Sequence, residues 1–318
     1  MLEIDKNYAE LPWLSALRTE LVSLCESERS PHSLLLYGRR GTGRRQLALW
    51  LVEALLGKDP LRTLAGSDEA VGHPDLLVVE PADGKASISV DQIRELVDFF
   101  RLTSHSSAGR LAIVWPAESM TVNAANSLLK TLEEPPAGSL IILISESVSR
   151  LPATIVSRCQ RLRVPLPPRE LAFEWLVAES GEPIPGDLLD FAGGAPLTAL
   201  ALHAASFGAT ASGFEKDIQE LQQRRAIPVE VAARWSKTPD LALEWLSWRL
   251  AGEVRSALGV STDIASGAVA SADNAGIAHA GFQQMEQIRE LRRLFRGGIS
   301  TELSLAGLLM GWYGGLGR

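Results

Sequence analysis

The sequence predicts an α/β domain with a parallel β-sheet in its first half and an all-helical second half. Four short runs of Leu, Ile and Val alternate with helical patterns before residue 165. A glycine-rich segment directly follows the first of these runs, and no strand pattern follows the proline-rich stretch 165–170. Strands that alternate with helices are typical of parallel sheets covered by helices on both sides. These three observations set the predicted fold class.

The four predicted strands are apolar runs without polar alternation, as expected of strands buried on both faces. They are HSLLLYG (32–38), DLLVVEP (75–81), RLAIVWP (110–116) and SLIILISES (139–147). The helical pattern RRQLALWLVEALLG follows the first strand at once. We therefore predict that residues 1–164 form an α/β domain of the nucleotide-binding type.

Two more helices are predicted between these strands. SVDQIRELVDFFRL begins with Ser89 and has Gln92 three residues later, the arrangement of a capping box. NAANSLLKTLEEPP (123–136) ends at two prolines, Pro135 and Pro136. Taken alone, this second pattern predicts a buried helix with an abrupt end. Its apolar positions at helical spacing are Val122, Ala125, Leu128, Leu129 and Leu132.

The second half is predicted to contain a small helical domain at 165–206 and a helical C-terminal domain at 207–318. Thr238 followed by Pro239 is a favoured helix start. FQQMEQIRELRRLFRGG carries apolar residues on one face, from Phe282 to Phe295. The segment 259–281, rich in Ala, Gly and Ser, is expected to be a loop.

Composition excludes several classes of protein. The 318 residues carry a net charge of −7, so the surface as a whole should not attract nucleic acid, and we expect no direct DNA contact. Two cysteines are too few for a disulfide scaffold. No apolar run approaches the roughly 18 residues of a membrane span. The N-terminal residues lack the pattern of a signal peptide, so we expect a cytoplasmic protein that does not bind membranes.

The segment GRRGTGRRQLALW (38–50) nearly matches the phosphate-binding pattern G-x-x-x-x-G-K-[ST]. Gly38, Gly41 and Gly43 stand where that loop needs them, but Arg44 replaces the lysine and Arg45 replaces the Ser or Thr. A guanidinium can contact phosphate. It has no acceptor, however, and cannot replace a hydroxyl on Mg²⁺. Any binding of ATP and Mg²⁺ by this loop is therefore in doubt.

The predicted strand RLAIVWP ends in Trp115 and Pro116, where an ATPase of this type would carry acidic residues. Two parts of the hydrolytic apparatus are thus missing, and we expect no ATPase activity. Two alternatives stay open at this point. The glycine turn could belong to a protein that never bound nucleotide, such as a scaffold with a remnant fold. The chain could also be a self-sufficient ATPase in which Arg44 replaces the lysine.

SLLKTLEEPP and TIVSRCQ, together with this loop, resemble the AAA+ clamp-loader subunits of bacterial DNA polymerase III. The resemblance extends to GHPDLLVVEP, SVDQIREL and GGAPLTAL within the first 200 residues and is only topological beyond them. Members of the gamma/tau group keep an intact Lys-Ser/Thr loop, whereas the delta-prime group often has a degraded one. The loop with Arg44 and Arg45 is similar to the delta-prime group.

This resemblance implies a three-domain subunit of DNA polymerase III, a DNA-directed DNA polymerase. Residues 1–164 would be the AAA+ P-loop domain, 165–206 a helical lid and 207–318 a collar that joins subunits into a ring. The implied partners are the gamma/tau and delta subunits, with the sliding clamp and primed DNA reached through the complex.

The resemblance also assigns a role to the Ser157-Arg158-Cys159 motif. Arg158 would be an arginine finger that acts in trans on the ATP site of a neighbouring gamma/tau subunit. The alternative is a purely local ion pair between Arg158 and Glu133 or Glu134.

Relatives commonly carry a four-cysteine zinc module before the HPDL strand. Here that interval contains no cysteine, and His73 stands alone. Structural zinc needs about four ligands, so we expect neither bound metal nor another cofactor. Cys25 and Cys159 are expected to be packed rather than reactive.

Overall fold

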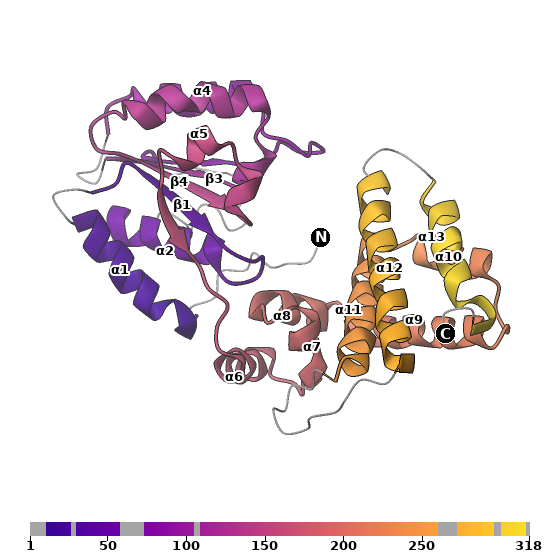
Figure 1. The fold of residues 1–318 in the computed structure, drawn as a ribbon. Coiled ribbons are helices and arrows are strands. Elements are labelled where there is room, and N and C mark those ends of the chain that lie inside the picture. The colour runs from indigo at the N-terminus through magenta and orange to yellow at the C-terminus, as the bar shows by residue number, and fades with distance from the viewer. Residues whose placement is uncertain are drawn as a thin grey trace. The chain divides into compact units, whose positions relative to one another are not determined.

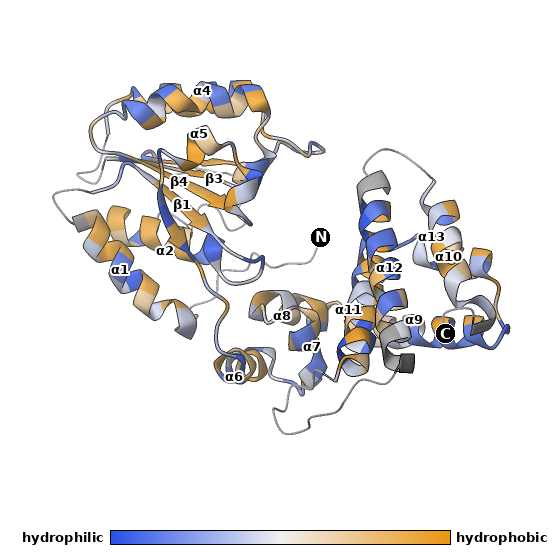
Figure 2. Ribbon diagram, viewed as in Figure 1, coloured by the Kyte–Doolittle hydropathy of each residue, from blue (hydrophilic) through white to orange (hydrophobic). Residues whose placement is uncertain are grey.

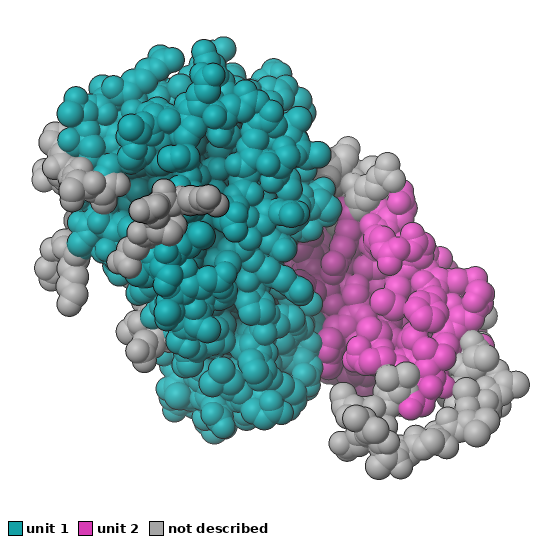
Figure 3. Space-filling view, turned by 60° about the vertical axis from the view of Figure 1, so that its left-hand side comes forward, with its two compact units in different colours: residues 1–205 teal, residues 206–318 magenta. Residues whose placement is uncertain are grey.

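The computed structural model of the chain describes residues 11–26, 30–57, 73–104, 109–259, 272–295 and 300–315. The chain divides into two compact units, Met1–Ala205 and Ser206–Arg318, which are coloured separately in Figure 3. Among the described residues, no helix has the length and hydrophobicity needed to cross a bilayer.

Unit 1 is built on a five-stranded sheet whose paired strands all run parallel, with strand order β2-β3-β4-β1-β5 (Figure 1). The strands are β1 (Ser33–Tyr37), β2 (Leu76–Val79), β3 (Arg110–Val114), β4 (Ser139–Ser145) and β5 (Gln160–Arg163). The first four confirm the sequence prediction. In Figure 2, β1, β3 and β4 are coloured mostly hydrophobic, as expected of strands covered on both faces.

The fifth strand was not predicted from the sequence. β5 lies at the sheet edge beside β1, where Leu36 is paired with Leu162. Only Leu162 is buried in β5, and the other three residues, Gln160, Arg161 and Arg163, are exposed. An edge strand with one buried side chain has no continuous apolar run, which was the pattern used for the other four.

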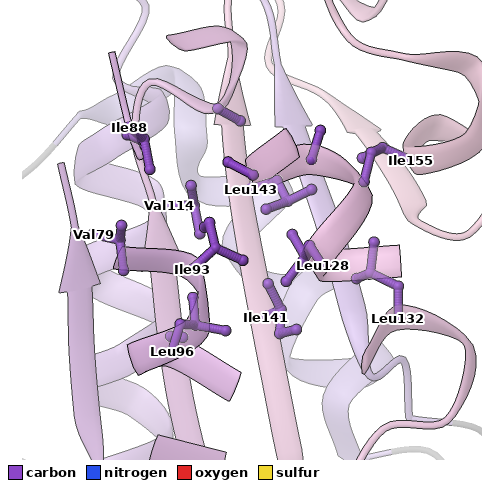
Figure 4. Close-up of a cluster of buried hydrophobic side chains, with 14 of the residues drawn as sticks. Val79, Ile88, Ile93, Leu96, Val114, Leu128, Leu132, Ile141, Leu143 and Ile155 are labelled. Carbon is purple, nitrogen blue, oxygen red and sulfur yellow. The ribbon is translucent and has the colours of Figure 1, made fainter. Parts of the chain in front are cut away.

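Helices cover both faces of this sheet. In Figure 1, α1 and α2 lie on one face and α4 and α5 on the other. The elements of this region are η1 (Pro12–Leu14), α1 (Ser15–Glu26), α2 (Arg44–Leu56), α3 (Val90–Phe100), η2 (Ala117–Ser119), α4 (Val122–Glu133), η3 (Val148–Arg150) and α5 (Ala153–Val156). The side chains between α3, α4, α5 and the sheet form one core cluster, shown in Figure 4. Its members include Ile93, Leu96, Val114, Leu128, Leu132, Ile141, Leu143 and Ile155.

The predicted capping box of α3 is confirmed. Ser89 Oγ accepts from the N–H of Gln92 at 3.3 Å, and Gln92 Oε1 accepts from the N–H of Ser89 at 3.1 Å. The predicted helix before the two prolines is also confirmed as α4, whose Leu128 and Leu132 are buried. The predicted apolar face of this helix wrongly included Val122. Val122 is the first residue of α4 and is 74% exposed.

The rest of the described chain is helical. Unit 1 continues with α6 (Arg169–Ser180), α7 (Gly186–Phe191) and α8 (Pro196–Ala204). Unit 2 contains α9 (Phe207–Gln222), α10 (Pro228–Trp235), α11 (Pro239–Ala257), α12 (Ala272–Phe295), α13 (Thr301–Leu309) and η4 (Met310–Gly315). Its core includes a ring cluster in which Phe214 lies 4.9 Å from Trp235 and 5.5 Å from Trp245, measured between centroids.

The expected loop at 259–281 is wrong in its last part. Residues 272–281 form the start of α12, while 260–271 lie outside the described residues. Alanine has the highest helix propensity of all residues, and this part of the segment is rich in it. The composition was interpreted as a loop because glycine and serine are mixed with the alanines.

Candidate functional site

The degenerate loop and the ends of three strands meet at one edge of the sheet. Gly38 directly follows β1, Glu80 follows β2, Trp115 follows β3 and Glu146 follows β4. These strands are parallel, so their carboxyl ends share one edge, which is where ligands bind in open α/β sheets. The fold therefore brings the predicted loop residues close to Trp115, which stands where an ATPase of this type would carry an acidic residue.

The loop keeps the backbone shape of a phosphate-binding loop. Gly41 has φ 79° and Gly43 has φ 94°, both in the left-handed region that favours glycine. Gly43 is the N-cap of α2, and no side chain caps that helix start. Exposed backbone N–H groups at a helix start are the ordinary means of binding phosphate. The shape alone would thus suit an anion.

One side of the loop is packed against α8. The N–H of Leu197 donates to the carbonyl of Gly41 at 3.1 Å. A Cβ atom added at Gly41 would lie 2.1 Å from Thr198 Oγ1, so only glycine fits there. Thr198 lies in the GGAPLTAL segment of the resemblance, but its contact with the loop, more than 150 residues away in sequence, was not predicted.

The other side of the loop is packed against the segment that leads into α1. Trp13 Nε1 donates to the carbonyl of Thr42 at 2.8 Å, and this bond is buried. A Cβ atom at Gly43 would lie 2.6 Å from Leu11 Cδ1. The loop backbone is therefore held from two directions by its own unit.

Arg44, at the position of the phosphate-binding lysine, is only 7% exposed. Burial lowers the pKa of its guanidinium, and the negative charges of Glu146 and Glu118 act in the opposite direction. Glu118 Oε1 also accepts from the N–H of Glu146 at 3.1 Å, which ties η2 to the end of β4. The buried cation at this position therefore feels the charges of two carboxylates, Glu146 and Glu118, and the opposing charges of Arg40 and Arg150.

Arg45 stands at the loop position whose hydroxyl holds Mg²⁺ in an intact phosphate-binding loop. Its Nη2 atom lies 3.1 Å from Glu80 Oε1, and its Cζ atom lies 4.6 Å from the ring centroid of Trp115. The side chain therefore bridges the ends of β2 and β3. A hydroxyl from the loop and a carboxylate after β3 would be the metal ligands, and both are replaced by members of this cluster. Glu80 was missed in the sequence, although it directly follows a predicted strand.

Arg158 lies immediately beyond α5, and its backbone is fixed to the sheet. Its carbonyl accepts from Ser33 Oγ at 2.7 Å, which joins it to the start of β1. Its Nε donates to Glu133 Oε1 at 2.8 Å, and its Nη2 donates to the same oxygen. Nη1 donates to the carbonyl of Thr154 at 2.9 Å. The local ion pair foreseen as the alternative reading is thus formed with Glu133, and the side chain is still 33% exposed.

Cys25 and Cys159 are both half-buried, and neither takes part in a disulfide. Burial raises the pKa of the Cys159 thiol to about 11, while a hydrogen bond involving Ser33 lowers it. A thiol with a raised pKa is a poor nucleophile near neutral pH because the thiolate is the reactive form. This agrees with the expectation that Cys159 is packed rather than reactive.

Across the described part of the chain, no cluster of three or more His, Cys, Asp and Glu could hold a metal ion. His73 instead makes a local contact, because its Nδ1 accepts from the N–H of Asp75 at 3.1 Å. Most of the interval in which relatives carry their zinc module lies outside the described residues, so the absence of zinc stays a prediction.

The sequence of this chain is similar to those of known proteins. The family described as "DNA polymerase III, delta subunit" matches residues 14–167. DNA polymerase III subunit delta' of Pseudomonas aeruginosa is 35% identical over 251 residues, which cover 75% of this chain and 76% of that protein. The delta' subunit of Escherichia coli is 33% identical over 215 residues, which cover 65% of this chain and 61% of that protein.

A solved structure supports the fold independently. A DNA polymerase III gamma subunit-related protein of Thermotoga maritima superposes with a TM-score of 0.52 at 23% identity, covering 95% of this chain and 99% of that one. The five-stranded parallel sheet and the helical remainder of this chain fit the AAA+ clamp-loader fold. With the sequence relatives at 33–35% identity, the chain belongs to the family of DNA polymerase III delta-prime clamp-loader subunits.

Proposed function

We propose that this chain is a non-hydrolysing delta-prime subunit that helps a DNA polymerase III clamp loader place the sliding clamp on primed DNA. The proposal that the chain does not hydrolyse ATP rests on the contacts of Arg45 with Glu80 and Trp115. A guanidinium fills the region that Mg²⁺ would need, and an indole ring replaces the acidic ligand. The residues present therefore do not fit a magnesium–nucleotide complex.

The chemical contribution of the chain is then made in trans by Arg158. ATP in AAA+ rings lies at subunit boundaries, bound by one subunit and completed by an arginine of the next. A planar guanidinium stays charged and grips phosphate oxygens as charge develops on them. Such a finger is worth roughly 10³–10⁵ in rate in well-studied phosphoryl-transfer systems. A chain without a working loop could in this way govern hydrolysis in its neighbour.

The division of labour along the chain follows the family. Residues 1–164 would act as the AAA+ P-loop domain, 165–206 as the lid and 207–318 as the collar that joins gamma/tau and delta subunits. Support for the lid comes from the contact of α8 with the loop through Leu197 and Gly41. Support for the collar comes from exposed apolar side chains on α10 and α13, such as Val229 and Leu303.

The test is an Arg158→Ala variant in a complex reconstituted with gamma/tau and delta subunits. We expect normal assembly, with DNA-stimulated ATP hydrolysis and clamp loading impaired at the one adjoining site. Arg161→Ala is the matched control, because Arg161 is an exposed arginine three residues away on β5. Unchanged hydrolysis and loading with Arg158→Ala would refute the role in trans, and a failure to assemble would favour a local structural role.

A further inference from the structure

We propose that Glu133 is a positioning residue that competes with the phosphate of a neighbouring ATP for the guanidinium of Arg158. The inference rests on the proposed action of Arg158 in trans and adds a restraint to it. Glu133 is the last residue of α4, and Arg158 follows α5, so the contact joins two different helices across 25 positions of sequence. It holds the side chain in a retracted state until a phosphate displaces the carboxylate.

The hydrogen bonds show why the two partners exclude each other. Nε and Nη2 of Arg158 both donate to Glu133 Oε1. Nη1 donates to the carbonyl of Thr154 at 2.9 Å and to Ser157 Oγ at 3.3 Å. These contacts engage four of the five N–H groups that a guanidinium carries. No edge with two free N–H groups remains, although such an edge is what binds phosphate bidentately.

The charge of Glu133, like the geometry of its hydrogen bonds, opposes the binding of a phosphate by Arg158. A carboxylate and a phosphate are both anions, so a phosphate approaching Arg158 would be repelled by Glu133 for as long as the pair is closed. Opening the pair is nevertheless inexpensive, because Arg158 is 33% and Glu133 50% exposed. Ion pairs this accessible to water contribute little to stability, so Glu133 should tune the engagement of Arg158 rather than prevent it.

The matched substitutions are Glu133→Gln and Glu134→Gln in the full clamp-loader complex. Glutamine keeps the size of the side chain and removes its charge. Glu134 is the adjacent, exposed glutamate, so its substitution removes the same charge at a neighbouring position. We expect Glu133→Gln to raise ATP hydrolysis in the absence of DNA by up to about fivefold at the site that Arg158 serves. Glu134→Gln should leave it unchanged.

A double variant separates positioning from stability. In the Arg158→Ala background, adding Glu133→Gln should leave the rate of ATP hydrolysis unchanged, because no guanidinium remains for Glu133 and the phosphate to compete for. A purely structural role of Glu133 would instead lower the Tm and act regardless of residue 158.

The two proposals fail in distinguishable ways. If Arg158→Ala itself leaves hydrolysis and loading unchanged, the action in trans is wrong. If Arg158→Ala impairs them but Glu133→Gln leaves the rate unchanged or lowers it, the competition is overturned and the action in trans stands. An equal rise with Glu134→Gln would also overturn it, since the effect would then be one of overall charge.

Discussion

The guanidinium of Arg45 lies over the ring of Trp115, with 4.6 Å between the Cζ atom and the ring centroid. The two residues stand at the two positions that supply magnesium ligands in a hydrolysing AAA+ protein. Each substitution alone would weaken a metal site. Together they form a cation–π contact of about 0.5–2 kcal/mol, which Glu80 extends with a carboxylate. Arg45, Trp115 and Glu80 thus make one packed contact at the carboxyl ends of β2 and β3.

The first prediction follows from this cluster. The purified chain should hydrolyse ATP no faster than background, measured as phosphate release in the presence of Mg²⁺. An Arg44→Lys, Arg45→Thr double variant should remain inactive, because Trp115 still replaces the acidic ligand after β3. Steady turnover by the unmodified chain that disappears on Arg44→Ala would show that Arg44 serves as the loop lysine after all.

The sequence predicted those features of the fold that depend on one short stretch of residues. Four strands were predicted because continuous apolar runs are required by burial on both faces. The loop was recognised from the spacing of its glycines, and the structure gives Gly41 and Gly43 the left-handed backbone that favours this residue.

Contacts between segments that are distant in the chain could not be predicted from short sequence patterns. The bonds of the loop to Trp13 and Leu197 depend on how η1 and α8 pack, and no pattern in the sequence pairs either residue with the loop. For Arg158 the sequence offered two roles, a finger in trans and a local pair. The structure contains the local pair, and in our proposal the two roles are successive states of the Arg158 side chain.

The second prediction concerns a buried ion pair that the sequence did not indicate. Asp75 is fully buried and Arg110 is 7% exposed, with Oδ1 and Nε 3.9 Å apart, an ionic contact rather than a hydrogen bond. Arg110 also donates to the carbonyl of Thr103 at 2.6 Å, which holds the segment after α3 to the start of β3. Removing one partner leaves an uncompensated buried charge, so Asp75→Ala should lower the free energy of unfolding by about 3–5 kcal/mol.

The control for this prediction is Asp91→Ala. Asp91 pairs with Arg94 at 2.9 Å on the surface of α3, and both side chains are more than half exposed. Exposed pairs of this kind contribute about 0–1 kcal/mol. Urea unfolding monitored by circular dichroism would compare the two variants. Equal losses would show that burial of the Asp75 pair contributes nothing.

The last prediction concerns the exposed apolar side chains of unit 2. Val229 on α10 is 53% exposed and Leu303 on α13 is 71% exposed, whereas Trp312 beyond α13 is buried. Large apolar side chains scattered singly on a surface carry no special meaning, but a collar that joins subunits must present some of them. If Leu303 is part of such an interface, Leu303→Asp should weaken association of the full chain with gamma/tau by about tenfold or more, since burying leucine contributes about 1.5–3 kcal/mol.

Glu302→Asp is the matched control, because it introduces the same residue at the adjacent exposed position without a change in charge. Association would be measured by co-purification and by sedimentation, with the Tm of each variant alone as the check on folding. A stable interface should bury roughly 1,000 Å² or more, so one substitution should weaken it without abolishing the fold. A Leu303→Asp chain that stays folded and joins gamma/tau as tightly as the unmodified chain would exclude this face of α13 from the collar.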